Sequence, residues 1–163
     1  MRGIRRKEKA ITDINLMKKI LQISKHITIA MCKENNPYLV TLSHGYDPDQ
    51  HCLFFHCASE GKKIDILKEN NIVWGQALID KGYIQGSCDH LYATVQFRGK
   101  VGFLTDFDEK KQVLVNMIKK LDDNPEEVIE KQLTEKSINR VNIGRIDIEF
   151  MSGKEAKEAV ITF

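Results

Sequence analysis

The clearest chemical capacity in this sequence is anion binding at two adjacent lysines, Lys62 and Lys63. They follow a strand-like apolar run, 52–57, and they open a short helical pattern in which Ile64 and Leu67 form an apolar stripe. The first turn of a helix presents unpaired N–H groups and positive partial charge, so ammonium groups there are unfavourable unless an anion is present. A bound phosphate would supply that anion. The alternative is a solvated lysine pair on a surface helix.

Ser59 lies between the apolar run and the helical pattern, where a helix N-cap is expected. A serine at that position accepts a hydrogen bond from the first turn of the helix. The sequence therefore predicts a strand, a turn capped by Ser59, and a short helix that begins beside the lysine pair.

Length and composition limit the classes of protein that this chain can belong to. Its 163 residues are enough for one domain with its own core, and 42% hydrophobic and 29% charged residues are ordinary for a globular protein. The net charge of +2 is too small to indicate a nucleic-acid partner. No apolar run approaches the ~20 residues of a membrane-spanning helix, and the basic start has no apolar segment typical of a secretory signal. We therefore expect a cytoplasmic protein with no membrane partner.

The four cysteines do not form a recognisable metal motif. No pair is separated by two residues, so we expect reduced thiols that mostly act as small core residues. Cysteine and histidine are adjacent at His56 and Cys57, but strand alternation sends these two side chains to opposite faces. We predict no metal site, with zinc as the less favoured alternative. The cysteines are Cys32, Cys52, Cys57 and Cys88.

The elements around the lysine pair read as six strands with helices between them. The expected strands are 27–33, 37–43, 52–57, 72–79, 91–104 and 141–150, and the expected helices cover 12–25, 106–121 and a segment from 124. The turn signal at 47–50 should make an antiparallel meander of the first three strands. Such a pattern favours a mainly β, α+β fold, namely a small antiparallel barrel with helices outside. We expect a single domain, 1–163, with a solvated basic arm at 1–11.

Three local features refine this expectation. The glycine-rich, poorly patterned segment 81–90 is the best candidate for a flexible loop over a site. Gly99, inside a long strand, predicts a bulge or a bend. Asp106 followed by Glu109 has the form of a capping box that starts a helix.

The segment around the lysines resembles the FMN-binding split-barrel proteins related to pyridoxamine 5′-phosphate oxidase, and specifically their nitroimidazole-resistance (Nim-like) branch. The matching positions are Phe55, His56, Cys57, Ala58, Glu60, Gly61, Lys62, Lys63, Ile64 and Asp65. Further similarities follow in the same order at 37–42, at Cys88 with 92–99, and at 145–154, so the resemblance covers most of the chain. One departure is Asn71, which follows Asn70 where many members have proline.

The resemblance implies a six-stranded antiparallel split β-barrel with outer helices that forms a homodimer. One FMN would lie in each interface cleft, with both subunits lining it. The residues carried over are Ser59, Lys62 and Lys63 for the phosphate, Val40, Thr41 and Leu42 for the isoalloxazine edge, and His56, Cys57 and Ala58 for the pocket wall. The alternatives are a hydrogen-bonded core histidine for His56, a solvent-facing charge for Lys63 and a small buried residue for Cys88.

The implied function is that of an FMN-dependent oxidoreductase. It would reduce small aromatic or nitro-aromatic acceptors or pass on electrons from a reduced nicotinamide. Because a flavin carries the redox chemistry itself, the sequence need not show a catalytic residue, and we identify none. The alternative is a non-catalytic flavin- or haem-binding carrier or sensor on the same barrel, for which histidines are candidate axial ligands. These are His26, His44, His51, His56 and His90.

Overall fold

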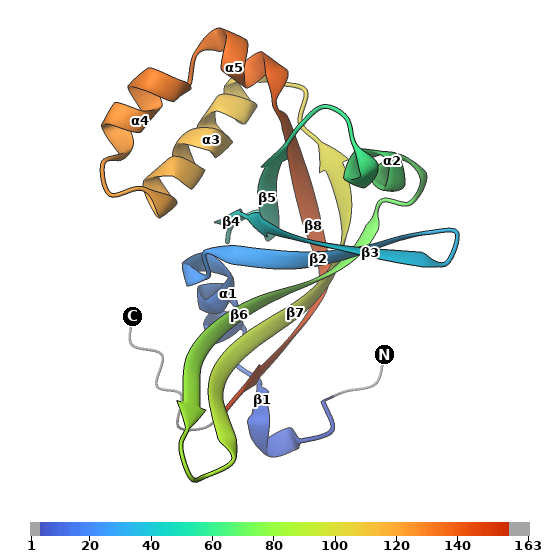
Figure 1. Ribbon diagram of the computed structural model, residues 1–163, viewed down its shortest axis with the longest axis vertical. Coiled ribbons are helices and arrows are strands. Elements are labelled where there is room, and N and C mark those ends of the chain that lie inside the picture. Colours follow the sequence, from blue (N-terminus) through green and yellow to red (C-terminus); the bar gives the residue numbers. More distant parts are fainter. Residues whose placement is uncertain (1–3, 157–163) are drawn as a thin grey trace.

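A strongly curved antiparallel sheet forms the centre of the computed structural model, which describes residues 4–156 (Figure 1). The described strands are β1 (Ala10–Ile11), β2 (His26–Lys33), β3 (Asn36–Ser43), β4 (Gly45–Asp47), β5 (Cys52–Cys57), β6 (Ile72–Ile84), β7 (Asp89–Phe103) and β8 (Asn142–Glu155). The described helices are α1 (Ile14–Ile23), α2 (Lys62–Glu69), α3 (Phe107–Leu121), α4 (Pro125–Gln132) and α5 (Glu135–Arg140), after a 3₁₀ turn at Lys7–Lys9. No helix in 4–156 is both long and apolar enough to cross a membrane.

The strand order in the sheet is β3-β2-β6-β7-β8-β5-β4, with β1 paired to β8. The antiparallel α+β architecture is thus confirmed and is that of a split barrel, although the described sheet has eight strands and does not close through hydrogen bonds. The expected meander of the first three strands is wrong. After β3 the chain forms the short strand β4, and β5 pairs with β4 and β8 instead of β3. The partner of β5 comes from the far end of the chain, so local spacing could not reveal it.

The segment 81–90 is not the expected flexible loop. β6 and β7 continue as a two-stranded ribbon through most of it, and only 85–88 connect them. Strand pairing resumes after a register shift between Asp80 and Gly82, and a hydrogen bond of 2.7 Å between His90 Nε2 and Asp80 Oδ1 also links the two strands. Because most of this ribbon is exposed on both faces, it lacks the alternation that identifies a strand with one buried face.

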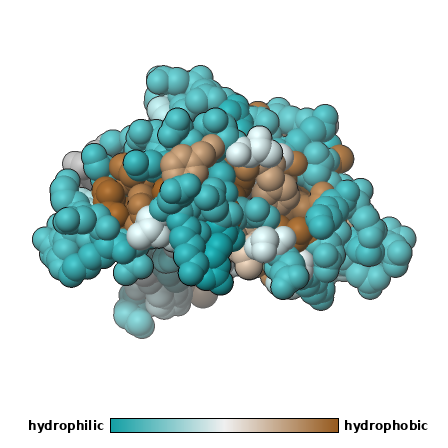
Figure 2. Space-filling view, turned by 90° about the horizontal axis from the view of Figure 1, so that it is seen from above, coloured by the Kyte–Doolittle hydropathy of each residue, from teal (hydrophilic) through white to brown (hydrophobic). Residues whose placement is uncertain are grey.

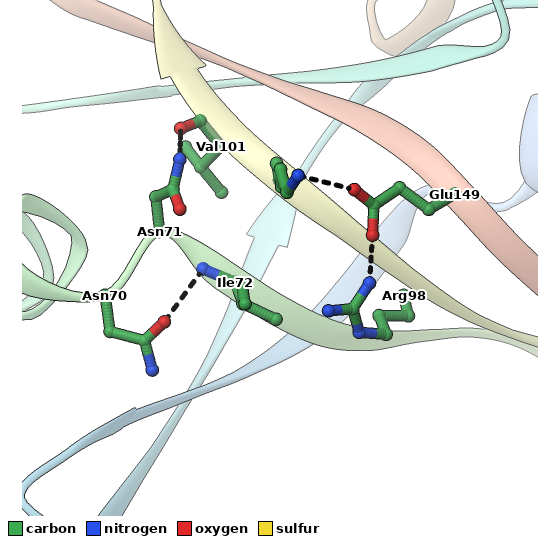
Figure 3. A network of polar contacts seen from close by, with 7 residues as sticks. Asn70, Asn71, Ile72, Arg98, Val101 and Glu149 are labelled. Atoms are coloured by element: carbon green, nitrogen blue, oxygen red, sulfur yellow. Dashed lines mark hydrogen bonds and ion pairs between the residues drawn. The ribbon is translucent and has the colours of Figure 1, made fainter.

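A bulge interrupts the pairing of β7 with β8, as expected at Gly99. Between Arg98 and Gly99 the register skips one residue of β8, Glu149. A Cβ atom at Gly99 would lie 2.4 Å from the carbonyl oxygen of Asp147, so only glycine fits this close approach. The skipped Glu149 carboxylate forms ion pairs with Arg98 and, at 3.2 Å, with Lys100 (Figure 3). The bulge bends both strands and is fixed by this charge cluster.

Two asparagines fix the turn after α2 (Figure 3). Asn70 Oδ1 accepts a hydrogen bond of 3.2 Å from the Ile72 backbone, and Asn71 Nδ2 donates one of 3.2 Å to the Val101 carbonyl. Asn70 Nδ2 also donates to the Cys32 carbonyl at 2.9 Å. These bonds tie the end of α2 to β2 and β7, so the turn is fixed without the proline that the resemblance led us to expect.

The core packs on both faces of β5. Leu53 and Phe55 enter the main cluster beneath α1 and α2, whereas Cys52 and Phe54 enter a second cluster with residues of α3. This double burial explains the apolar run at the start of β5, since residues 52–55 are buried on both faces of the strand. Gly144 of β8 lies against the ring of Phe55, where a Cβ atom would come within 2.2 Å of the ring.

Aspartate side chains cap the starts of α1 and α3, and the cap at Asp106 is the one that the sequence predicts. Asp13 accepts a hydrogen bond of 2.8 Å from the Asn15 N–H at the start of α1, and Asp106 does the same for the Glu109 N–H at the start of α3. The basic arm 1–11 is not solvated over its whole length. Residues 1–3 lie outside the described residues, but β1 pairs with β8 and Ile11 is buried.

Candidate functional site

The turn between β5 and α2 is where the sequence places the anion site. β5 ends at Cys57 and α2 begins at Lys62, as expected, but the predicted N-cap is wrong. The N-cap residue is Gly61 with φ of +123°, and Ser59 lies two residues earlier in an exposed bend. Gly61 adopts this backbone conformation because it has no Cβ, and its carbonyl accepts the N–H of Ile64 at 2.8 Å.

No side chain of the described residues caps α2. The first turn therefore keeps N–H groups that are free to meet a ligand. Lys62 and Lys63 stand at this turn, and neither forms an ion pair with a carboxylate among residues 4–156. This combination of an uncapped helix start and two unpaired ammonium groups suits a bound phosphate.

The two lysines lie against different aromatic rings. Lys62 Nζ is 4.6 Å from the centre of the Tyr38 ring, beside a cavity of about 280 Å³ that also touches β3. Lys63 Nζ is 5.3 Å from the centre of the Phe55 ring. Lys62 is exposed, whereas Lys63 is only half-exposed. Lys63 is therefore not the fully solvent-facing charge of the alternative interpretation.

A cavity of about 510 Å³ lies beside the end of β5. His56, Cys57 and Ala58 line it, and Ser137 and Arg140 of α5 complete the lining with Val141. α5 reaches this place because β8, which follows it, pairs Asn142 with Cys57. Sequence reasoning missed Ser137 and Arg140, since no motif links them to β5. The one signal that could have found them is the pairing of β8 with β5.

Burial and the charge of Lys63 set the protonation of the cavity wall. Burial lowers the pKa of His56, and the nearby Lys63 ammonium lowers it further. Burial raises the pKa of Cys57, with Lys63 opposing that shift. At neutral pH the wall therefore offers a neutral imidazole and a thiol rather than an imidazolium and a thiolate. The His56 ring is partly exposed and forms no hydrogen bond within 4–156, so it is not a satisfied core histidine.

The three β3 residues expected near the flavin ring alternate between the two faces of the sheet. Val40 and Leu42 are half-buried and pack on the main core, as does Cys57. Thr41 is exposed on the opposite face, where its hydroxyl lies 2.9 Å from that of Thr28. The structure thus gathers the β5 and α2 residues at one turn and places Thr41 on the outer face of the sheet.

This outer face carries exposed apolar side chains that residues 4–156 do not cover. Leu39 and Leu78 are 61% and 50% exposed, and Trp74 is 40% exposed with its ring edge against Phe150. Leu39 and Trp74 also border a shallow cavity of about 340 Å³ together with Thr28. Large apolar side chains gathered on one exposed face indicate an interaction surface.

Cys88 does not join any of these cavities. It is exposed in the connection between β6 and β7, with φ of +48°, so the expectation of a small buried residue is wrong. Cys52, in contrast, is buried as expected. Among residues 4–156 no three histidine, cysteine or acidic side chains gather into a metal-binding group.

Residues 17–155 match the protein family described as pyridoxamine 5′-phosphate oxidase. No curated protein sequence matches the chain. Three solved structures illustrate the shared fold. A putative 5-nitroimidazole antibiotic resistance protein from Bacteroides thetaiotaomicron has a TM-score of 0.76 and 24% identity over 89% of this chain and 85% of that one.

The second solved structure is a flavocytochrome from Azotobacter vinelandii. Its TM-score is 0.80 at 17% identity, over 96% of this chain and 73% of that one. The third is a FAD-binding protein from Mesorhizobium loti, with a TM-score of 0.67 and 22% identity over 91% of this chain and 98% of that one. At these identities the likeness shows a common fold.

Proposed function

The chain belongs to the pyridoxamine 5′-phosphate oxidase family, and on that premise we propose that it is an FMN-binding oxidoreductase for small aromatic or nitro-aromatic acceptors. The observation that carries the proposal is the start of α2, where residues 4–156 provide no side-chain cap and no acidic partner for Lys62 or Lys63. Two further facts support it: one similar structure is a FAD-binding protein and another a putative nitroimidazole resistance protein.

The residues at this corner fit a phosphate-bearing cofactor. The N–H groups of the first turn, Lys62 and Lys63 would hold the phosphate, with Ser59 close by in the preceding bend. Val40, Thr41 and Leu42 would border the ring edge, and His56, Cys57 and Ala58 would line the pocket. The flavin, when bound, supplies the electron and hydride transfer, for which a reduced nicotinamide is the proposed donor. His56, neutral at pH 7, can donate or accept one hydrogen bond toward a bound molecule.

We further propose that two copies associate through the outer face, with the flavin between the subunits. Leu39, Trp74 and Leu78 present apolar side chains there that the described part of the chain leaves exposed. Thr41 lies on the same face, so a second copy would bring its own residues beside β3. A dimer of this kind would bury the exposed apolar surface and complete the cofactor site at once.

Trp74→Glu is expected to convert the dimer into monomers, because a carboxylate in a buried apolar interface cannot be solvated. Size-exclusion chromatography with light scattering measures the change. Ile14→Glu is the matched control, since Ile14 is a comparably exposed hydrophobic residue on α1, away from this face. Wild type and control should stay dimeric, and a Trp74→Glu protein of unchanged mass would contradict this interface.

The visible spectrum of the purified protein tests the flavin proposal. We expect absorption bands of an oxidised flavin, either as isolated or after incubation with FMN, and their bleaching on addition of a reduced nicotinamide and recovery with a nitro-aromatic acceptor. Protein that stays colourless after FMN is added would contradict flavin binding. Flavin bands without turnover would point to the carrier alternative.

A Soret band would favour the haem alternative, for which the structure narrows the candidate ligand. His44, His51 and His90 each have a ring nitrogen in a hydrogen bond with another residue. His56 has no such bond and lies in a cavity wall, so it is the histidine best placed to ligate iron. His56→Ala should then abolish the Soret band.

A further inference from the structure

An apolar slot of about 280 Å³ lies between α3 and α4, beyond the face of β5 that packs on α3. Its apolar lining comes from Leu114, Met117, Ile118, Leu121 and Val128, and its polar lining from His56, Asp122 and Gln132. Figure 2, which looks down on the helix-bearing end of the molecule, shows hydrophobic side chains in hollows framed by hydrophilic ones. A cavity of about 150 Å³ accommodates benzene, so this slot has room for a substituted ring.

His56 borders both the slot and the cavity at the end of β5, so the two lie next to each other. We call the two cavities together the His56 cleft. One part of the cleft is apolar, and the other contains Arg140 and Ser137. A molecule lying across His56 would therefore meet an apolar wall at one end and a polar, cationic wall at the other.

The charged residues of the cleft determine which ligand charge is favoured at each end. Arg140 forms no ion pair and no side-chain hydrogen bond among residues 4–156, and Lys63 is close enough to lower the pKa of His56. The acidic residue of the lining, Asp122, borders the slot and not the cavity of Arg140. An anionic group is thus favoured at the Arg140 end and disfavoured at the Asp122 end, which fixes the orientation of the ligand.

We propose that the His56 cleft binds a small amphipathic organic acid, with its apolar body between α3 and α4 and its carboxylate at Arg140. This site shares the wall formed by His56, Cys57 and Ala58 with the proposed flavin pocket, but it goes beyond that proposal because it uses neither Lys62 nor the β3 residues. A guanidinium pairs with a carboxylate through two parallel N–H donors, and Arg140 lines this cavity. An uncharged apolar ligand would leave the Arg140 end unused, and an ammonium group at that end would be repelled by the Arg140 charge.

The test is a titration of the full-length protein with 4-phenylbutyrate, followed through backbone amide shifts in ¹H–¹⁵N spectra, with and without FMN. We expect saturable binding with a Kd of about 1 mM or tighter, and shifts at Leu121, Val128 and Arg140. The corresponding neutral amide should bind about tenfold more weakly, and the amine more weakly still. Because the spectra locate the ligand with or without FMN, failure here is distinguishable from failure of the flavin proposal.

Arg140→Gln should weaken the acid about tenfold and leave the amide unchanged. Lys136→Gln is the matched control, an exposed cation on the same helix that lines neither cavity. Leu121→Asp, at a slot position that is 40% exposed and tolerant of substitution, should weaken acid and amide alike. Equal affinity for acid and amide, an Arg140→Gln protein that behaves like the control, or no saturable binding below about 10 mM would each overturn the proposal.

Discussion

Lys63→Ala is expected to weaken FMN binding by about 1.5–3 kcal/mol, a roughly ten- to hundredfold rise in Kd. Lys63 stands in the first turn of an uncapped helix, has no acidic partner among residues 4–156, and is only half-exposed beside Phe55. Its charge is therefore less screened by water than that of a surface lysine, and the helix start adds N–H donors to the same anion. Lys62, which is exposed over Tyr38, should contribute less.

Quenching of FMN fluorescence on binding measures this effect. Lys68→Ala is the matched control, because Lys68 lies on the same helix, exposed and in its last turn. The control should bind FMN like wild type, with circular dichroism showing that all three proteins are folded. If Lys63→Ala and Lys68→Ala bind FMN equally well, the phosphate lies elsewhere.

The second large effect is a loss of stability in acid, and it comes from His44. This histidine is fully buried, and its Nε2 donates a hydrogen bond of 2.7 Å to the Leu21 carbonyl. Lys120 Nζ lies 3.2 Å from the His44 carbonyl and 3.3 Å from Nε2, and Nδ1 has no partner in residues 4–156. Burial first, and then the Lys120 charge, lower the pKa of His44 from 6.5 to about 4. An added proton on Nδ1 would be buried without an acceptor.

The folded-state pKa of His44 lies below its unfolded value, so neutral His44 is favoured in the folded protein. The stability linked to this group is present above pH 6.5 and is lost as the pH falls toward about 4. A shift from 6.5 to about 4 corresponds to about 3 kcal/mol. We expect wild type to lose this much of its free energy of unfolding between pH 7 and pH 4 on account of His44.

Urea unfolding at pH 7 and pH 4 measures the loss, with His44→Leu as the comparison. The leucine variant lacks the bond to Leu21 and should be less stable at pH 7, but the part of the pH dependence that His44 causes should disappear. Other titrating groups act alike in both proteins and cancel in the difference. An identical pH dependence in the two proteins would show that His44 does not titrate in this range.

The sequence identified β5 and α2 because their signals are local. β5 is an apolar run that both faces bury, and the run 52–57 matches the observed strand. Asp13 and Asp106 cap their helices through bonds to residues two and three positions away. Gly99 marks a bulge because a Cβ atom would meet a backbone carbonyl. Each of these features depends on residues that are a few positions apart or on the absence of a side chain.

What the sequence missed depends on partners that are distant along the chain. The pairing of β5 with β8 replaces the expected meander and brings Arg140 to the cavity beside Cys57. The ribbon of β6 and β7 is held by cross-strand bonds, while its exposed residues show no apolar period. Ser59 has the right side chain for a cap, but the backbone of Gly61 is what the turn requires.

The phosphate at the start of α2 is the centre of the functional account, and a comparison of FMN with riboflavin tests it most directly. The two flavins differ only by the phosphate, so the ring contacts cancel. We predict that wild type binds FMN at least about tenfold more tightly than riboflavin, and that Lys62→Ala/Lys63→Ala removes this preference without unfolding the protein. Equal affinity for the two flavins, or a preference that survives the double substitution, would contradict the account.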